Sequence, residues 1–208
     1  MEKQNNVILI LDTTSEELFL SLLINGEERR CYLKDCKSTH SVLLLKKIDE
    51  LLTENGLTIK DVDCVALSVG PGSFTGIRIG VSTAKAFQYA LGLKIIAVNS
   101  LEACAYNYKE QKTCVIIDAK HNNAYTGVFN GENKELGFYN GKVIESLKED
   151  KLFISPYANT FGAKVVENYY DGFVALVKER AKQGLYDEDF APLYLKLSQA
   201  EEEENALS

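Results

Sequence analysis

Apolar runs and an Asn-Gly turn near the start of the chain predict a β-hairpin. Residues 7–11 are all apolar, which predicts a buried strand, and the polar turn 12–15 follows it. Leucine and isoleucine dominate Leu18–Ile24, which predicts a second strand. An Asn-Gly pair then leads into Glu27–Leu33, and this pair is typical of a tight hairpin turn. The chain therefore opens with three strands.

Helices and strands alternate after this hairpin. The leucine spacing of residues 39–54 predicts an amphipathic helix, capped by a Ser-Thr pair and ended by an Asn-Gly pair. Residues 62–69 predict a buried strand, and Phe74–Leu91 contains no proline and predicts a long helix. Lys94–Val98 predicts another strand, and a further helix begins near Ser100. The predicted order is β-β-β-α-β-α-β-α.

From residue 113 the pattern of the first half begins again. The apolar run before Asp118 matches the one before Asp12, and each is followed by a polar turn, an apolar strand and an Asn-Gly pair. Such a repeat predicts a duplicated α/β domain, although two hairpins can also resemble each other by chance. We therefore expect two lobes, residues 1–105 and 106–208, of which the second is reduced.

The second half contains less helical material than the first. A brief helix is expected after Asn140 and a strand near 152–154. Helical spacing of apolar residues appears at 163–169 and again at 173–183. Residues 192–196 predict a last docked element before an acidic end.

The paired aspartate turns resemble those of the actin, sugar-kinase and heat-shock-chaperone ATPase (ASKHA) superfamily, in which two lobes clamp the phosphates and metal of a nucleotide. On that resemblance Asp12 and Asp118, with Thr13 and Thr14 as hydroxyl donors, form a candidate degenerate nucleotide site. The alternative is that each aspartate caps its own turn by accepting hydrogen bonds from backbone N–H groups. Neither turn has the glycines that let a backbone wrap around phosphate.

A glycine-rich run, residues 70–80, joins a predicted strand to a predicted helix, as phosphate-binding loops do. Its spacing fits neither the P-loop nor the G-x-G-x-x-G turn nor the G-x-S-x-G elbow. Gly76, Gly80 and Ala84 instead form one stripe along the helix. Because this helix is apolar nearly all round, we expect it to be buried on two sides. One side faces its own sheet, and the other faces either helices of this chain or a partner subunit.

Composition and charge narrow the function classes. The net charge of −7 and the pI near 5.0 argue against a protein that binds nucleic acid by itself. No apolar run reaches the roughly 20 residues of a membrane helix, and no signal-peptide core is present, so we expect a cytoplasmic protein without membrane contact. The five cysteines form no C-x-x-C and indicate reduced thiols. His40 and His121 form no H-x-x-x-H pair, so we expect no metal and no other cofactor.

Short motifs along the chain resemble those of the TsaB (YeaZ) family. The most specific is Gly-Pro-Gly-Ser-Phe-Thr-Gly at residues 70–76. The other matching segments are residues 10–15, 39–41, 77–80, 83–85, 99–103, 118–119 with Tyr125, and 192–195. The resemblance is dense over residues 7–105 and thin after residue 130.

The resemblance implies a non-catalytic scaffold or activator for the N6-threonylcarbamoylation of adenosine 37 in tRNA. Such a subunit binds the transferase TsaD and, with it, the ATPase TsaE, and it forms a homodimer when TsaD is absent. The tRNA would be reached only indirectly, through the complex. TsaD itself carries a metal-binding histidine motif that this chain lacks.

The resemblance also places the partner contact on two helices, residues 39–54 and 74–91. A four-helix bundle with two helices from each chain would bury both apolar faces. The interface residues expected on this basis are His40, Leu44, Leu45, Ile48, Leu52, Phe74, Gly76, Ile77, Gly80, Val81, Ala84 and Phe87.

The alternative is an enzyme of the same superfamily. An ATPase or small kinase would use Asp12 and Asp118, and a glycoprotease-like peptidase would need a nucleophile with a base or a metal. His40 and His121 have no spacing that promises such a pair. Nucleotide binding without turnover in the cleft between the lobes is compatible with the scaffold hypothesis.

Overall fold

The computed structural model describes residues 6–36, 39–130 and 133–196, and these form two five-stranded sheets. The first sheet has the order β3-β2-β1-β4-β5 and the second the order β10-β9-β6-β7-β8. The strands of the first sheet are β1 (Val7–Asp12), β2 (Leu18–Ile24), β3 (Glu27–Leu33), β4 (Cys64–Ser68) and β5 (Lys94–Val98). Those of the second are β6 (Thr113–Asp118), β7 (Asn123–Asn130), β8 (Asn133–Asn140), β9 (Leu152–Ser155) and β10 (Lys164–Val165).

The two sheets have the same connectivity. In the first, β1 pairs antiparallel with β2 and parallel with β4. In the second, β6 pairs antiparallel with β7 and parallel with β9. Each sheet is completed by a hairpin strand on one side and a parallel strand on the other. The duplicated α/β fold predicted from the sequence is therefore confirmed. The second copy is reduced, because β10 has only two residues.

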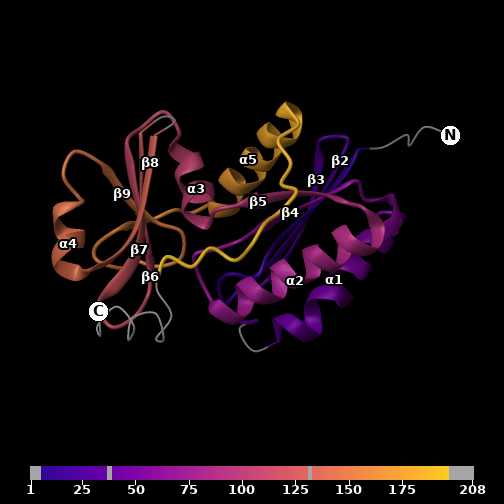
Figure 1. The fold of residues 1–208 in the computed structure, drawn as a ribbon, viewed down its shortest axis with the longest axis horizontal. Helices are drawn as coiled ribbons and strands as arrows, with labels where there is room; N and C mark the ends of the chain where they lie inside the picture. Colours follow the sequence, from indigo (N-terminus) through magenta and orange to yellow (C-terminus); the bar gives the residue numbers. More distant parts are fainter. Residues whose placement is uncertain (1–5, 37–38, 131–132, 197–208) are drawn as a thin grey trace.

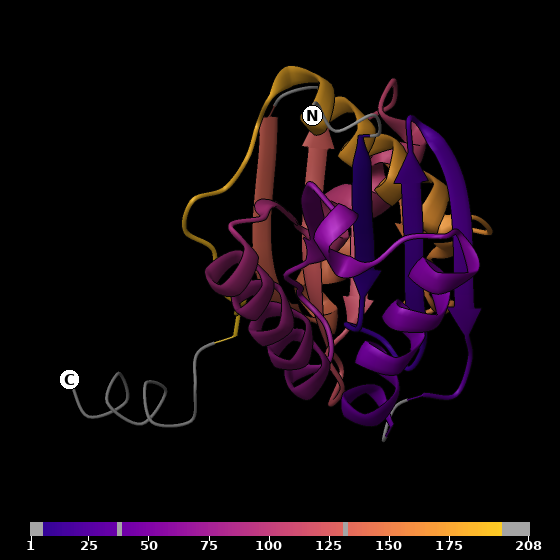
Figure 2. The ribbon, with the colours of Figure 1, turned by 90° about the vertical axis from the view of Figure 1, so that its right-hand side faces the viewer.

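The helices form three layers around the sheets (Figure 1). They are α1 (His40–Glu54), α2 (Phe74–Leu91), α3 (Ser100–Ala105), α4 (Gly141–Ser146) and α5 (Tyr169–Gln183), with single 3₁₀ turns at Ile59–Asp61 and Tyr106–Tyr108. α1 and α2 lie side by side on the outer face of the first sheet (Figure 2). α3 and α5 lie between the two sheets, and α4 covers the outer face of the second.

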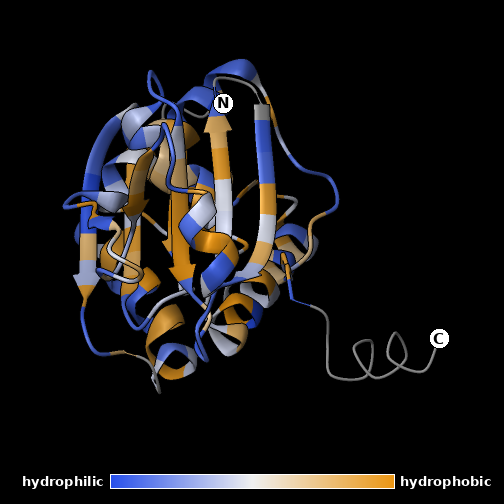
Figure 3. Ribbon diagram, turned by 90° about the vertical axis from the view of Figure 1, so that its left-hand side faces the viewer, coloured by the Kyte–Doolittle hydropathy of each residue, from blue (hydrophilic) through white to orange (hydrophobic). Residues whose placement is uncertain are grey.

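The largest core cluster lies between the two sheets. It joins Ile10 of β1 and Val115 of β6 to Leu101 of α3 and Phe173 of α5, all fully buried. A second cluster packs α1 and α2 on the first sheet. Hydrophobic residues are concentrated in the strands, whereas the connecting loops are mainly hydrophilic (Figure 3). Both faces of the central strands β1, β2 and β4 are therefore covered, which fits their almost uninterrupted apolar residues.

Local signals set the ends of α2. The Ser73 side chain accepts a hydrogen bond from the Gly76 amide and caps the first turn. Gly92 follows the helix with a φ of 67°, a left-handed conformation that glycine adopts without steric cost. The Ser-Phe-Thr-Gly run thus fixes where this helix begins.

The helix expected at residues 163–169 is not formed. Lys164 and Val165 instead pair in parallel with Ile154 and Ser155 of β9. The α5 helix begins only at Tyr169. A long-range strand partner outweighs the local helical spacing here, because strand formation depends on neighbours that are distant in the sequence.

Candidate functional site

The glycine stripe of α2 packs against its own chain. A Cβ atom at Gly76 would overlap the carbonyl oxygen of Thr13, and one at Gly80 would lie 2.8 Å from the Thr13 hydroxyl oxygen. That hydroxyl donates a 2.7 Å hydrogen bond to the Gly76 carbonyl. Gly76 and Gly80, expected at a partner interface, therefore lie against a turn of their own chain. The glycines let α2 lie directly on the turn after β1.

Most of the expected interface residues are buried inside the chain. The expected interface residues that are buried are His40, Leu44, Ile48 and Leu52 of α1 and Gly76, Ile77, Gly80, Val81 and Ala84 of α2. His40 Nε2 also lies 3.0 Å from the Glu17 carbonyl oxygen, within hydrogen-bond distance. These residues lie on the most apolar stripes of the two helices, and such stripes pack first against the chain's own sheet. Except for Leu44, which also lines the groove between the two helices, they are buried in the interior of this chain rather than exposed to a partner.

The outward faces of α1 and α2 nevertheless carry large hydrophobic side chains. Val42 is 73% exposed, Leu45 is 57% exposed and Phe74 is 54% exposed. Phe87, also expected at the interface, is half-buried. Sequence reasoning found Leu45 and Phe74 but missed Val42. A patch of neighbouring apolar side chains of this kind marks an interaction surface more often than scattered exposed residues do.

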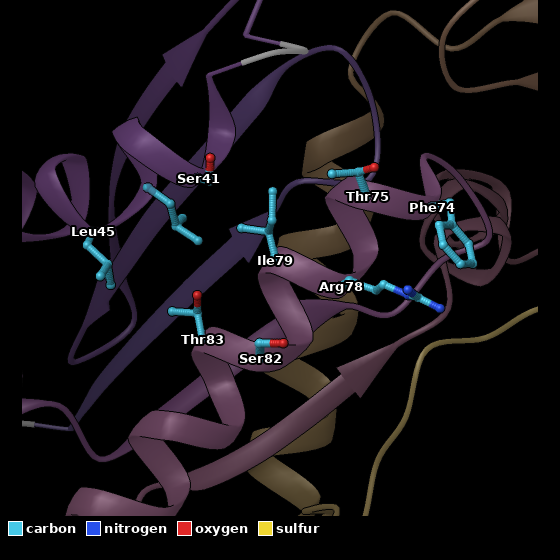
Figure 4. A pocket seen from close by; sticks show the side chains of 9 residues that line it. Ser41, Leu45, Phe74, Thr75, Arg78, Ile79, Ser82 and Thr83 are labelled. Atoms are coloured by element: carbon cyan, nitrogen blue, oxygen red, sulfur yellow. The ribbon is translucent and has the colours of Figure 1, made fainter.

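A groove of about 490 Å³ runs between the two helices (Figure 4). It is lined by Ser41, Leu44 and Leu45 of α1 and by Phe74, Thr75, Arg78, Ile79, Ser82 and Thr83 of α2. We call the groove together with Val42 the α1–α2 face. Its centre is apolar and its rim carries hydroxyl groups, which is the usual anatomy of a protein–protein contact.

Arg78 and Tyr194 fix one end of this face. The Arg78 guanidinium lies 3.8 Å from the centre of the Phe74 ring, and its Nε donates a 2.9 Å hydrogen bond to the Tyr194 hydroxyl. The rings of Phe74 and Tyr194 stack with their centres 5.1 Å apart. The C-terminal segment therefore holds Phe74 in place. No local sequence pattern indicates this cluster, because Tyr194 lies 116 residues from Arg78.

The candidate nucleotide site at Asp12 is already filled by the chain. Asp12 is fully buried, and its Oδ1 accepts hydrogen bonds from the Thr14 amide at 2.8 Å and from the Thr14 hydroxyl at 2.7 Å. Its Oδ2 accepts one from the Tyr169 hydroxyl at 3.4 Å. Burial raises the pKa of the Asp12 carboxyl, although these hydrogen bonds oppose the shift. The turn-capping alternative describes Asp12 correctly.

Tyrosine side chains occupy the space beside this turn. The Tyr157 hydroxyl lies 3.4 Å from the Thr14 hydroxyl, and the Tyr157 and Tyr169 rings meet edge to face. Tyr170 stacks on Phe19 of β2 with ring centres 4.0 Å apart. With these rings in place, Asp12 has no exposed surface on which a phosphate group could bind.

Asp118 is arranged differently and lies at the surface. It accepts hydrogen bonds from the amide and the ammonium group of Lys120, both at 2.8 Å. Partial burial opposes ionisation of Asp118, but the hydrogen bonds and charge of Lys120 outweigh it and lower its pKa. Each aspartate therefore caps its own turn. Across the described ranges no group of histidine, cysteine and acidic side chains could hold a metal ion.

Comparison with known proteins gives relatives whose names refer to the threonylcarbamoylation of tRNA. A family model described as TsaD, tRNA N6-adenosine threonylcarbamoyltransferase, matches residues 34–148. The tRNA threonylcarbamoyladenosine biosynthesis protein TsaB of Haemophilus influenzae is 34% identical over 127 residues, which cover 59% of this chain and 53% of that protein. The TsaB protein of Buchnera aphidicola subsp. Schizaphis graminum is 30% identical over 149 residues, 69% of each chain.

The chain spans about half the length of the first of these relatives, and its match to the Bacillus subtilis TsaB, at 34% identity, covers 56% of that protein. Among solved structures, YeaZ from Pseudomonas aeruginosa superposes with a TM-score of 0.68 at 22% identity, covering 91% of this chain and 100% of that one. This likeness supports the fold. Within the part of the chain that the structure describes, no helix is both long and apolar enough to span a membrane.

Proposed function

Because the chain belongs to the TsaB (YeaZ) family, we propose that it is a non-catalytic subunit in the synthesis of N6-threonylcarbamoyladenosine in tRNA. In this proposal it binds a TsaD-like transferase and, with it, a TsaE-like ATPase in the cytoplasm. A second copy of the chain takes the place of the transferase when the transferase is absent. The net charge of −7 favours contact with tRNA through the complex rather than directly.

The observation that carries the proposal is the α1–α2 face. Val42, Leu45 and Phe74 expose more than half of their surface, and they flank a groove that is lined, within the described residues, by side chains of α1 and α2 alone. Exposed aromatic and aliphatic anchors beside a groove are the features that another helix pair would bury. The four-helix arrangement therefore remains the proposal, with the outward side chains replacing the buried ones as its contacts.

The Asp12 turn supports a role without catalysis. Its carboxyl and both threonine hydroxyls are engaged inside the chain, and tyrosines fill the neighbouring space. His40 is buried, with its Nε2 3.0 Å from the Glu17 carbonyl oxygen, so its ring is not presented to a substrate in solution. We also propose the division into lobes at residues 105 and 106, with the partner held by the first lobe.

Charge placed on the α1–α2 face tests the proposal. Leu45→Glu and Val42→Glu should abolish co-purification with the TsaD-like transferase of the same organism and should leave the isolated chain monomeric in sedimentation. Val143→Glu is the matched control, because Val143 is exposed on α4, on the other side of the molecule. Folded Leu45→Glu and Val42→Glu variants that still bind the transferase would refute the assignment. Gly80→Leu and Ile77→Glu would not test the partner contact, because both residues pack inside the chain.

ATP turnover distinguishes the enzyme alternative. The purified chain should release no phosphate from ATP, and calorimetry with ADP and ATP should give no binding at the Asp12 turn. Phosphate release that is lost in Asp12→Ala would overturn the proposal in favour of an ATPase.

A further inference from the structure

A second pocket lies on the opposite side of the first lobe from the α1–α2 face. Its walls come from α3 and the turn after it, from α5, and from the adjoining ends of β6, β7 and β8. Its volume is about 380 Å³, which falls within the range of small-molecule sites. We call it the α3–α5 pocket. None of its lining residues belongs to the α1–α2 face or to the Asp12 turn.

The pocket has an apolar surface and one unsatisfied polar group. Phe129, Leu176 and Ala105 supply the apolar part. Thr113 also lines it and is only 1% exposed, and its hydroxyl has no hydrogen-bond partner among the described residues. A buried hydroxyl without a partner is costly in free energy and marks a place where an unseen group would be favourable.

Charged side chains ring the pocket in two groups. In the first group, the Glu102 carboxylate accepts a 2.7 Å hydrogen bond from the Arg180 guanidinium and lies 3.5 Å from the Lys134 ammonium. Arg180 is fixed further by a 2.7 Å hydrogen bond to the Ala97 carbonyl. In the second group, Glu179 accepts a hydrogen bond from the Tyr106 hydroxyl and lies 3.9 Å from Lys109. Three cations thus face two carboxylates, an excess of positive charge on a chain whose net charge is −7.

The two lysines are the groups that a ligand can recruit. Their separations from the glutamates, 3.5 and 3.9 Å, exceed the usual 2.7–2.9 Å of a charge-assisted hydrogen bond. Both lysine side chains are about half exposed. Each lysine–glutamate ion pair therefore contributes little to stability, and breaking it costs little free energy. Lys109 also donates a long hydrogen bond of 3.4 Å to the Tyr106 hydroxyl, whereas the carboxylates of Glu102 and Glu179 accept shorter ones from Arg180 and Tyr106. The pocket therefore favours an anion over a cation.

We propose that the α3–α5 pocket binds a small organic carboxylate with an apolar body and a second hydrogen-bonding group. The carboxylate lies between Lys109 and Lys134, the apolar body lies on Phe129 and Leu176, and the second polar group meets Thr113. This site is independent of the role proposed for the α1–α2 face.

Binding of 3-(4-hydroxyphenyl)propanoate tests the site, with the uncharged 3-(4-hydroxyphenyl)propanamide as its matched neutral probe. Two-dimensional NMR of the full chain should show that both probes perturb amides around Thr113 and Leu176. The acid should bind about fivefold more tightly than the amide, because two lysines favour the carboxylate. Lys109→Met combined with Lys134→Met should remove that preference. Lys142→Met, which removes an exposed charge from α4, should retain it.

Thr113→Val tests the buried hydroxyl separately. It should weaken both probes about threefold while leaving the unfolding temperature unchanged or higher, because it removes an unpaired polar group. Three results would overturn the proposal: no perturbation at the pocket at about 10 mM probe, equal affinity of acid and amide, or unaltered binding in both the lysine and the threonine variants.

Discussion

At the scale of single residues, Gly76 and Gly80 let α2 rest on the turn that contains Thr13. The Thr13 hydroxyl donates to the Gly76 carbonyl inside the core. A helix interior normally disfavours glycine by about 1 kcal/mol relative to alanine. Here the close contact with Thr13 reverses that preference, because there is no room for a Cβ atom.

Gly76→Ala should therefore destabilise the protein by about 3 kcal/mol, the upper range for overpacking a core. Ser82→Ala is the matched control on the exposed side of the same helix and should change the free energy of unfolding by less than about 0.5 kcal/mol. Urea unfolding measures both. A Gly76→Ala variant as stable as the parent would show that α2 does not lie this close to Thr13.

The two capping aspartates should give opposite pH dependences. Burial raises the pKa of Asp12 above its ordinary 3.8. The contribution of Asp12 to the free energy of unfolding is therefore fully present below pH 3.8 and is lost as the pH rises through the raised pKa. Asp12→Asn keeps the acceptor for Thr14 and removes the buried charge. Its stability relative to the parent should therefore increase with pH above 3.8.

Asp118→Asn provides the comparison. Lys120 lowers the pKa of Asp118, so that residue stabilises the parent above pH 3.8 and the effect is lost as the pH falls through the lowered pKa. Urea unfolding at several pH values measures both variants. Parallel curves for the two would contradict the assigned environments.

At the scale of elements, the segment after α5 covers the free edge of β5 and then reaches α2 (Figure 1). The Asp187 amide donates to the Ile95 carbonyl at 2.9 Å, and the Asp187 carboxylate accepts from the Ala97 amide at 2.7 Å. Phe190 is buried, with the Lys85 ammonium over its ring. An exposed strand edge invites pairing with other chains, so this cover protects the first sheet.

Asp187→Ala should expose that edge. Loss of a hydrogen bond to a charged acceptor, about 1.5 kcal/mol, should speed hydrogen exchange of the Ala97 amide about tenfold. Glu188→Ala changes the neighbouring exposed acid and should leave the rate unaltered. Equal rates in the two variants would mean that the segment is not anchored through Asp187.

At the scale of the whole molecule, the two lobes share one core. The cluster between the sheets includes residues of β1 and β6 and most of the buried face of α5. The cluster around Ile144 touches only the second sheet. The lobes are therefore expected to unfold together when the shared core is damaged.

Phe173→Ala tests this coupling. Removing a fully buried phenyl ring should cost about 3–5 kcal/mol and should speed amide exchange in both β1 and β6. Ile144→Ala, also fully buried, should cost about 2–5 kcal/mol and act mainly on the second sheet. Exchange that increases in only one sheet for Phe173→Ala would show that the lobes are independent.

The sequence by itself determined the local elements and the duplication. Runs of apolar residues, Asn-Gly turns and the Ser73 cap act over a few residues, so they can be recognised without the fold. The repeated strand-Asp-turn-strand pattern predicted both sheets. The same reasoning identified α1 as an amphipathic helix and α2 as a helix with too many apolar faces. The interface residues that it predicted include Leu45 and Phe74, whose side chains are exposed.

Only the tertiary structure decided which face of each helix points inward. A helix that is apolar nearly all round has no unique inner side in its sequence, and glycines serve a partner or the chain's own backbone equally well. The contact of Gly76 with Thr13 resolved this choice. The Arg78–Tyr194 cluster, the tyrosines beside Asp12 and the α3–α5 pocket were likewise decided by the fold, since their residues come from distant segments.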